Sequence, residues 1–254
     1  MFNYFITIHN SEAHLNFVLD GLFKCSSDLD RVWCILDGCT DGSKEIVKDY
    51  GLQYIELKDV RETRAITYAL KNLPLSEYNV ILQDDVVIQS SMFESDIRKA
   101  YEKFPDIGVL GMRHGANFGK DAEELSIVQN EFQPPVGKFE NLKSGHITER
   151  QLVFKSPICL SKKVVETLGG YDDRFAPIGY DDYEYCIQAY KAGFKNYVYA
   201  LDIDQPVEWG GTRRNPVSNY RQYEIDHLKL LKELYPKEIE TLSTNHPSLE
   251  QIKI

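Results

Sequence analysis

Two adjacent carboxylates, Asp84 and Asp85, follow an apolar run at residues 79–83 and could bind a metal ion. An aliphatic run that ends in acid is typical of a buried strand that delivers charge to the edge of a sheet, where ligands of α/β proteins bind. Neighbouring carboxylates repel each other, and a divalent cation would offset that repulsion. Mg²⁺ takes one or two protein carboxylates and leaves its other positions to phosphate and water. The pattern indicates either a metal and phosphate site or a solvated Asp-Asp turn.

Two further acidic segments lie next to predicted elements. Residues 37–43 follow a predicted strand and open a predicted helix, and their Gly and Asp residues suit a tight turn. Asp181 and Asp182 fall in the first turn of another predicted helix, where the helix dipole favours anions. A carboxylate held there could also act as a general base on a hydroxyl nucleophile. Each segment therefore has a structural and a chemical interpretation.

Strand and helix patterns alternate along the first ninety residues. The predicted strands are 2–8, 31–36, 52–57 and 79–82, and the predicted helices are 11–23, with Ser11 as N-cap, 43–50 and 62–73. Such alternation with short loops implies parallel strands in a layered sheet. Residues 1–90 are therefore expected to form a nucleotide-binding half.

The rest of the chain has a less regular pattern. Helices are predicted at 91–104, 162–168, 181–192 and 220–235, strands at 107–112 and 151–160, and a long functional or mobile loop at 114–150. No internal repeat is evident. We expect one domain over residues 1–254.

Charge and cysteine content narrow the class of protein. The net charge is −10, and because nucleic-acid binders need clustered Lys and Arg, no nucleic-acid partner is expected. The five cysteines are scattered, which is typical of reduced thiols in a cytosol. No run approaches the ~20 apolar residues of a membrane span. We expect a soluble cytoplasmic protein, for which peripheral membrane contact stays open.

The three acidic segments, in this order, resemble the motifs of the inverting family-two glycosyltransferases of the GT-A fold. Residues 37–43 are similar to the family's Asp-Gly-Ser-Thr-Asp-Gly-Ser turn, and residues 83–85 resemble its Asp-x-Asp metal motif in a variant with two adjacent acids. Residues 169–172 and 181–185 resemble its Gly-Gly-Phe-Asp and Glu-Asp-x-Asp-Leu segments, and residues 7–10 resemble its Thr-x-Tyr-Asn opening. The resemblance covers roughly residues 3–195.

The resemblance implies a fold and an activity. The fold would be a Rossmann-like, mostly parallel central sheet flanked by helices, with an acceptor-binding C-terminal half. Residues 1–90 would bind the nucleotide sugar, 91–214 would form the acceptor and catalytic half, and 215–254 would be a C-terminal helical extension. The activity would be a metal-dependent, inverting transfer of sugar from a nucleotide-diphosphate donor, most often a UDP-sugar, to a hydroxyl of a glycan or lipid-linked saccharide. The cofactor would be Mn²⁺ or Mg²⁺.

The resemblance also implies roles for individual residues. Asp182 would be the base, and Asp181 would orient the acceptor. Asp85 would bind the metal, and Asp84 would hold the ribose. The other residues expected around the nucleotide sugar are Thr7, His9, Asn10, Glu12, Asp37, Arg64 and Gln83. Trp209 and Arg213 are expected near the acceptor or the diphosphate.

The chain departs from the family pattern in three places. Gln188 stands where Arg is common, His9 stands where Tyr is common, and residues 206–212 lack the His that often approaches the diphosphate. Two alternatives stay open. A nucleotidyltransferase would have a similar fold, but its Gly-rich, basic loop after the first strand is missing here. A non-catalytic relative would bind nucleotide or glycan, and the acids Asp85 and Asp182 argue against it.

Overall fold

The computed structural model describes residues 1–26, 28–112, 114–119, 127–128, 142–155, 157–210, 218–248 and 250–254. A nine-stranded sheet forms its centre. The strand order is β14 (Ile252–Lys253), β9 (His146–Glu149), β12 (Lys195–Tyr199), β6 (Ile107–Gly111), β11 (Ile158–Ser161), β4 (Tyr78–Gln83), β1 (Phe2–Ile8), β2 (Val32–Asp37) and β3 (Gln53–Leu57). β4, β1, β2 and β3 are parallel, whereas β11 is antiparallel to both β4 and β6. The predicted mostly parallel sheet is confirmed.

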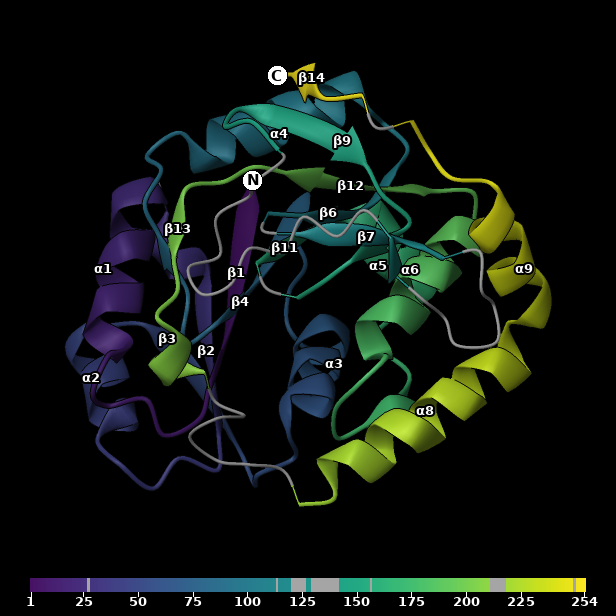
Figure 1. Ribbon diagram of the computed structural model, residues 1–254. Coiled ribbons are helices and arrows are strands. Elements are labelled where there is room, and N and C mark those ends of the chain that lie inside the picture. The colour runs from purple at the N-terminus through teal and green to yellow at the C-terminus, as the bar shows by residue number, and fades with distance from the viewer. Residues whose placement is uncertain are drawn as a thin grey trace.

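Helices cover both faces of this sheet (Figure 1). One face packs against α1 (Leu15–Cys25), α2 (Ser43–Asp49) and α4 (Phe93–Lys103). The other face packs against α3 (Glu62–Asn72), α5 (Lys162–Leu168) and α6 (Asp181–Lys191), and this second core also includes α8 (Tyr220–Leu234) and α9 (Pro236–Thr244). In Figure 1 the yellow-green α8 and α9 lie outside α5 and α6.

Alternation along β1 explains why the sheet is covered on both faces. Tyr4, Ile6 and Ile8 pack into the core on the α1 side, and Phe5 between them packs into the core on the α3 side. Because successive side chains of a strand point to opposite faces, an apolar strand of this kind needs helices on both sides. Burial on both faces also fixes the register of the strand with its neighbours.

The register brings the predicted site segments to one edge. Thr7 of β1 lies opposite Ile35 of β2 and opposite Gln83 of β4. Since the three strands are parallel, the residues that follow them, from His9, Asp37 and Asp84 onward, meet at the carboxyl edge of the sheet. This is where ligands bind in open α/β sheets.

The second part of the chain differs from the predicted elements. The predicted loop at 114–150 contains β7 (Gly115–Phe118), β8 (Ile127–Val128) and β9. The single strand predicted at 151–160 is two strands, β10 (Leu152–Val153) and β11, which belong to different sheets. Strands of two to four residues are too short for alternation to be recognised, and Pro157 has no N–H to donate to a ladder.

Three smaller differences complete the comparison. A short sheet pairs β5 (Val87–Ile88) with β13 (Ile203–Asp204), and α9 follows α8, which was expected to be the last helix. The first helix begins at Leu15, four residues after the predicted N-cap, because the side chain of Ser11 donates to Asp84 instead of capping the helix. Within the described ranges no helix is long and apolar enough to cross a membrane.

Asn196 of β12 is a buried polar residue that ties the sheet to α6. Its Oδ1 accepts from the Val109 N–H at 3.1 Å, and its Nδ2 donates to the carbonyls of Gln151 and Cys186 at 3.0 and 3.1 Å. The side chain is 3% exposed.

Asn196→Ala should therefore lower the free energy of unfolding. Three buried backbone groups would lose their partner, and each such loss costs about 1–3 kcal/mol, so we expect a decrease of about 3 kcal/mol or more in urea denaturation. Asn72→Ala is the matched control, because Asn72 is exposed at the end of α3. It should change the stability by less than about 0.5 kcal/mol. Equal effects of the two substitutions would contradict the structural role of Asn196.

Candidate functional site

Asp84, at the end of β4, holds the loop that follows β1. Its Oδ2 accepts from the backbone N–H of His9 at 2.8 Å and from the hydroxyl of Ser11. Asp84 and Asp85 are 8% and 7% exposed. Two buried carboxylates at the edge of the sheet are hard oxygen donors, and this donor chemistry fits Mn²⁺ or Mg²⁺.

Asp37, at the end of β2, shapes the loop between β3 and α3. Its Oδ1 accepts from the Val60 N–H at 2.7 Å and its Oδ2 from the Arg61 N–H at 2.8 Å. Asp59 and Arg61 have φ angles of 53° and 72°, in the left-handed region. The charge-assisted bonds to Asp37 hold this unusual loop, and each carboxylate oxygen keeps a second lone pair for a ligand.

Asp37 also belongs to a second group of residues that could hold a metal ion. His9, Asp37 and Asp59 each offer one ligand atom, and these atoms lie within 4.8 Å of one another. His9 Nδ1 also lies 2.5 Å from the carbonyl oxygen of Asp37. The group does not include Asp85, so it differs from the predicted metal ligand.

The other predicted residues of the β1–α1 loop bind the turn at residues 39–43. Asn10 Oδ1 accepts from the Thr40 N–H at 2.7 Å, and Glu12 Oε2 accepts from the Gly42 N–H at 2.9 Å. Both side chains fasten two loops of the expected donor rim to each other. Thr7 is buried, with 8% of its surface exposed, on the side of the sheet that faces α3.

Arg64 is placed differently from the prediction. It lies on the exposed side of α3, and its Nε donates to Asp173 Oδ1 at 2.5 Å. Asp173 belongs to a short 3₁₀ helix, η2 (Asp173–Phe175). The bond to Arg64 lowers the pKa of Asp173. The structure therefore pairs Arg64 with η2 and not with the rim around Asp37.

Asp182 lies in the first turn of α6 and is partly buried. Burial raises its pKa to about 7, the charge of Asp181 also raises it, and the ammonium of Lys155 lowers it. Its Oδ1 accepts from the Tyr183 N–H at 3.0 Å. A carboxylate with a pKa near the working pH is suited to accept a proton from a hydroxyl.

Asp181 points into the protein, which differs from the predicted role of orienting the acceptor. It is 2% exposed, and its Oδ2 accepts from Thr63 Oγ1 at 2.7 Å and from Lys155 Nζ. Lys155 Nζ also lies 3.4 Å from Glu62 Oε2, and Gln83 Nε2 donates to Glu62 Oε1 at 2.5 Å. Successive residues of a helix point about 100° apart, so the inward direction of Asp181 leaves Asp182 to face the site.

Sequence reasoning missed Lys155, Glu62 and Thr63. The available signal was a lysine inside the apolar segment at residues 152–160, where a strand interior has no place for an unpaired charge. Glu62 was not distinguishable from an ordinary acid in the first turn of a helix, which the helix dipole explains by itself.

Aromatic rings surround the start of α6. Tyr183 stacks on Phe154 with ring centroids 5.6 Å apart, and Tyr180 meets Tyr183 edge-on at 4.9 Å. All three residues are partly exposed. Aromatic faces beside a carboxylate suit a ligand that has both apolar C–H faces and hydroxyl groups.

Trp209, which was expected near the acceptor or the diphosphate, packs on α1 and the loop before it. Trp209 belongs to the short 3₁₀ helix η3 (Val207–Trp209). Its ring stacks on the rings of His14 and Phe17, with centroids 4.7 and 5.7 Å apart. Arg213 lies outside the described residues.

Glu184 lies behind Asp182, where the family often has an Arg partner at position 188. Gln188 Nε2 and the Tyr235 hydroxyl each donate to Glu184 Oε1 at 2.5 Å. Burial raises the pKa of Glu184, and the two hydrogen bonds lower it in part. Glu184 is therefore bound by two neutral donors, one of which is Gln188, the residue that stands where Arg is common.

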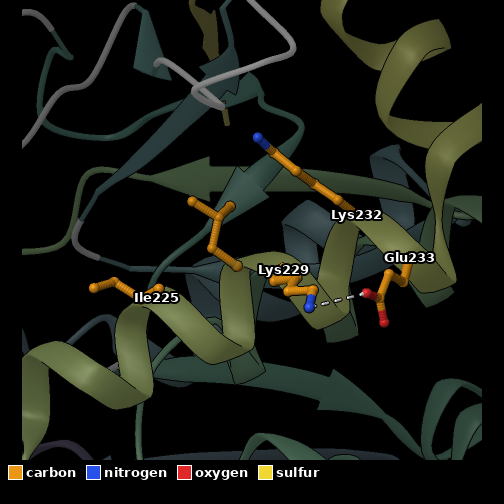
Figure 2. A pocket seen from close by; sticks show the side chains of 5 residues that line it. Ile225, Lys229, Lys232 and Glu233 are labelled. Carbon is orange, nitrogen blue, oxygen red and sulfur yellow. Dashed lines mark ion pairs between the residues drawn. The ribbon is translucent and has the colours of Figure 1, made fainter.

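A surface cavity on α8 lies apart from these residues. Its volume is about 380 Å³, and it is lined by Ile225, Leu228, Lys229, Lys232 and Glu233 (Figure 2). Lys229 and Glu233 form an ion pair at 3.9 Å. None of the predicted site residues lines this cavity.

The sequence of the chain matches the model of one protein family, and its fold matches several solved structures. Residues 4–156, more than half of the chain, match the model of the family described as glycosyl transferase family 2. No curated protein matches the chain by sequence.

Several solved structures share its fold at low sequence identity. GalNAc-T7 with UDP, GalNAc and Mn²⁺ is 10% identical with a TM-score of 0.73, over 94% of this chain and 50% of that one. The mannosyltransferase PcManGT from Pyrobaculum calidifontis, with GDP-Man and Mn²⁺, is 15% identical with a TM-score of 0.54, over 78% and 54%. TarS from S. aureus with UDP-GlcNAc is 17% identical with a TM-score of 0.54, over 79% and 55%. The chain thus spans about half the length of these structures.

The sheet and the helices that cover it have the same fold as these solved structures. By its sequence, the chain belongs to glycosyl transferase family 2.

The raised pKa of Asp182 makes the stability depend on pH. The pKa is about 7 in the folded chain and 3.8 for an ordinary aspartate, so between these values the folded chain keeps a proton that the unfolded chain has lost. This contribution to stability is complete below about pH 4 and is lost as the pH rises through about 7.

Asp182→Asn should therefore gain stability relative to the parent as the pH rises from 5 to 8. We expect a gain of about 2 kcal/mol in urea denaturation, because one pKa unit corresponds to about 1.4 kcal/mol and the side chain is partly solvated. Asp49→Asn, an exposed substitution on α2, serves as the control and should show no such trend. A constant difference between Asp182→Asn and the parent from pH 5 to pH 8 would show that the pKa of Asp182 is not raised.

Proposed function

We propose that the chain transfers a sugar, with inversion, from a nucleotide-diphosphate donor to a hydroxyl of a saccharide acceptor. The observation that carries this proposal is the chain of contacts between the two predicted centres. Gln83, next to Asp84, donates to Glu62, Glu62 pairs with Lys155, and Lys155 pairs with Asp181, the residue before Asp182. The carboxylates at the end of β4 and the carboxylate at the start of α6 therefore belong to one connected site.

The donor is proposed to bind at the edge formed by β4, β1 and β2. Asp84 would hold the ribose and Asp85 the metal, while Thr7, His9, Asn10, Glu12 and Asp37 would form the rim around the nucleobase. The solved structures of TarS and PcManGT contain UDP-GlcNAc, and GDP-Man with Mn²⁺, respectively. We infer a nucleotide-sugar donor for this chain as well, and UDP is the nucleotide that we expect.

Charge balance supports a bound cation. If Asp84 and Asp85 are both ionised, a metal-free complex would bring them together with the anionic diphosphate in a place where both side chains are buried. Bound Mn²⁺ or Mg²⁺ would supply positive charge that stabilises the departing diphosphate. Asp85 is the residue that we propose as its ligand.

Asp182 is proposed to take the proton of the acceptor hydroxyl. The oxygen of the acceptor forms a bond to the anomeric carbon, and the bond from that carbon to the phosphate oxygen breaks. The proton moves to the Asp182 carboxylate, and the electron pair leaves with the nucleoside diphosphate. Attack from the side opposite the leaving group inverts the anomeric centre. A general base of this kind contributes about a hundred- to ten-thousand-fold.

The acceptor is proposed to be a glycan or a lipid-linked saccharide. Phe154, Tyr180 and Tyr183 offer aromatic surfaces next to Asp182, and aromatic rings pack well on the C–H faces of sugars. The nucleotidyltransferase alternative has no comparable support, because the family whose model matches residues 4–156 is glycosyl transferase family 2.

Asp85→Ala should abolish metal-dependent binding of the donor nucleotide. The substitution removes the proposed metal ligand and leaves the diphosphate facing Asp84 without a cation. Isothermal titration calorimetry with UDP in the presence and absence of Mn²⁺ measures this, and the parent should bind UDP only with metal. Asp49→Asn should bind like the parent. Unchanged Mn²⁺-dependent UDP binding by Asp85→Ala would exclude Asp85 as the ligand.

Asp182→Asn should keep nucleotide binding and lose transfer. Removing the base should reduce transfer to a saccharide acceptor by about a hundred- to ten-thousand-fold, while the affinity for UDP with Mn²⁺ stays within about twofold. A panel of nucleotide sugars, tested first for Mn²⁺-dependent hydrolysis by the parent, identifies the donor for this assay. Full activity of Asp182→Asn would place the base elsewhere.

A further inference from the structure

Lys155 is a buried cation surrounded by carboxylates. Its side chain is 9% exposed, and its Nζ pairs with Asp181 Oδ2 and lies 3.4 Å from Glu62 Oε2. The ammonium also lies 5.3 Å from the centre of the Tyr171 ring. Burial opposes the charge of Lys155, but the neighbouring carboxylates, Asp181 first among them, raise its pKa above the usual range. Lys155 is therefore charged at neutral pH.

This cation joins three segments that are far apart in the sequence. Glu62 is the first residue of α3, Lys155 follows β10, and Asp181 is the first residue of α6. Thr63 adds a hydrogen bond to Asp181 at 2.7 Å. A buried ion pair of this kind gains little net stability, because the charges lose their hydration, but it specifies which groups must lie together.

The charges that face Asp182 are few. On α6 its neighbour is Asp181, and from the segment after β10 it faces Lys155. Asp182 also interacts with the Cys186 thiol and with four tyrosines: Tyr171, Tyr180, Tyr183 and Tyr220. Burial raises the pKa of the thiol and of each of these hydroxyls, to about 12 for Tyr220, so they are neutral at pH 7. Among the described residues, the charged groups that act most strongly on Asp182 are therefore Asp181 and Lys155.

We propose that Lys155 is a positioning residue that offsets the charge of Asp181 and thereby allows Asp182 to lose its proton near neutral pH instead of at a higher pH. Without the ammonium, two adjacent carboxylates would share a desolvated site, and one of them would hold a proton. Because Lys155 also binds Glu62, the ionisation of Asp182 depends on contact between α6 and the first turn of α3. The effect of Lys155 on the charge of Asp182 does not depend on the proposed function. The role of Asp182 as the base rests on the proposed function.

The titration of Asp182 tests this charge effect without an activity assay. The ¹³C resonances of aspartate carboxyl groups are followed by NMR from pH 4 to pH 9, and Asp182→Asn identifies the resonance of Asp182. Lys155→Met should move the midpoint of Asp182 upward by about one pH unit or more, whereas Asp181→Asn should move it downward. The double variant Lys155→Met/Asp181→Asn should return the midpoint to a value between those of the two single variants.

A purely structural lysine would give a different result. The double variant restores charge balance but not the ion pairs, so it would not correct the midpoint if Lys155 acted only through packing. Lys162→Met is the matched control, because Lys162 forms an exposed ion pair with Glu166 at 3.7 Å on α5. It should leave the Asp182 midpoint within about 0.2 units of the parent.

An unchanged Asp182 midpoint in Lys155→Met would overturn the proposal. If Lys155→Met does not fold, the comparison is made between Asp181→Asn and the double variant, which lacks an unpaired buried charge. The proposal then requires a lower midpoint in Asp181→Asn, and equal midpoints overturn it.

Measurements of transfer separate this proposal from the proposed function. In Lys155→Met the acid limb of the pH profile for transfer should move upward with the Asp182 midpoint, with about a tenfold loss below both midpoints for a shift of one unit. If the midpoint shifts but the parent transfers no sugar, the charge effect stands and the proposed function fails. If the parent transfers sugar but neither the midpoint nor the profile of Lys155→Met changes, the proposed function stands and the role of Lys155 fails.

Discussion

The parallel register of β4, β1 and β2 is the constraint on which the candidate site depends. Thr7 pairs with Ile35 on one side and Gln83 on the other, so the three strands end together at one edge. The acids that follow them then bind the loops. Asp37 holds the loop before α3, and Asp84 holds the loop after β1. These carboxylates therefore shape the edge of the sheet at which we propose that the donor binds.

Desolvation is the second physical factor, and it acts differently on two neighbouring acids. Asp181 is buried against a hydroxyl and an ammonium, which compensate its charge. Asp182 is partly buried and accepts one backbone hydrogen bond, from the Tyr183 N–H, and burial raises its pKa to about 7. A difference in direction on one helix turn separates a structural carboxylate from one suited to accept a proton. The division of roles follows from environment and not from residue type.

The C-terminal helices support the start of α6 from behind. Tyr235, between α8 and α9, donates to Glu184, and His227 Nδ1 on α8 lies 3.0 Å from the carbonyl oxygens of Ile178 and Gly179. These two carbonyls belong to the loop that leads into Asp181 and Asp182. Within the predicted extension, α8 and Tyr235 thus hold Glu184 and the loop before α6 with neutral hydrogen bonds. The division of the chain into donor and acceptor halves stays a prediction.

The parallel half of the sheet and the places where carboxylates gather could be predicted from the sequence alone. Continuous apolar runs in β1, β2 and β4, with helical spacing between them, are local properties, so the strands and the acids at their ends were recognisable. The short strands within 114–150 and the pairing of Arg64 with η2 depend on contacts in the folded chain. The tertiary structure also decided that Asp181 turns inward to Lys155, 26 residues away in the chain. Contacts between distant segments depend on packing and desolvation, which leave no periodic signal in the sequence. For this reason Asp84 and Asp85 could be singled out from the sequence, whereas a lysine inside an apolar segment indicates that Lys155 needs a partner but not that the partners are Asp181 and Glu62.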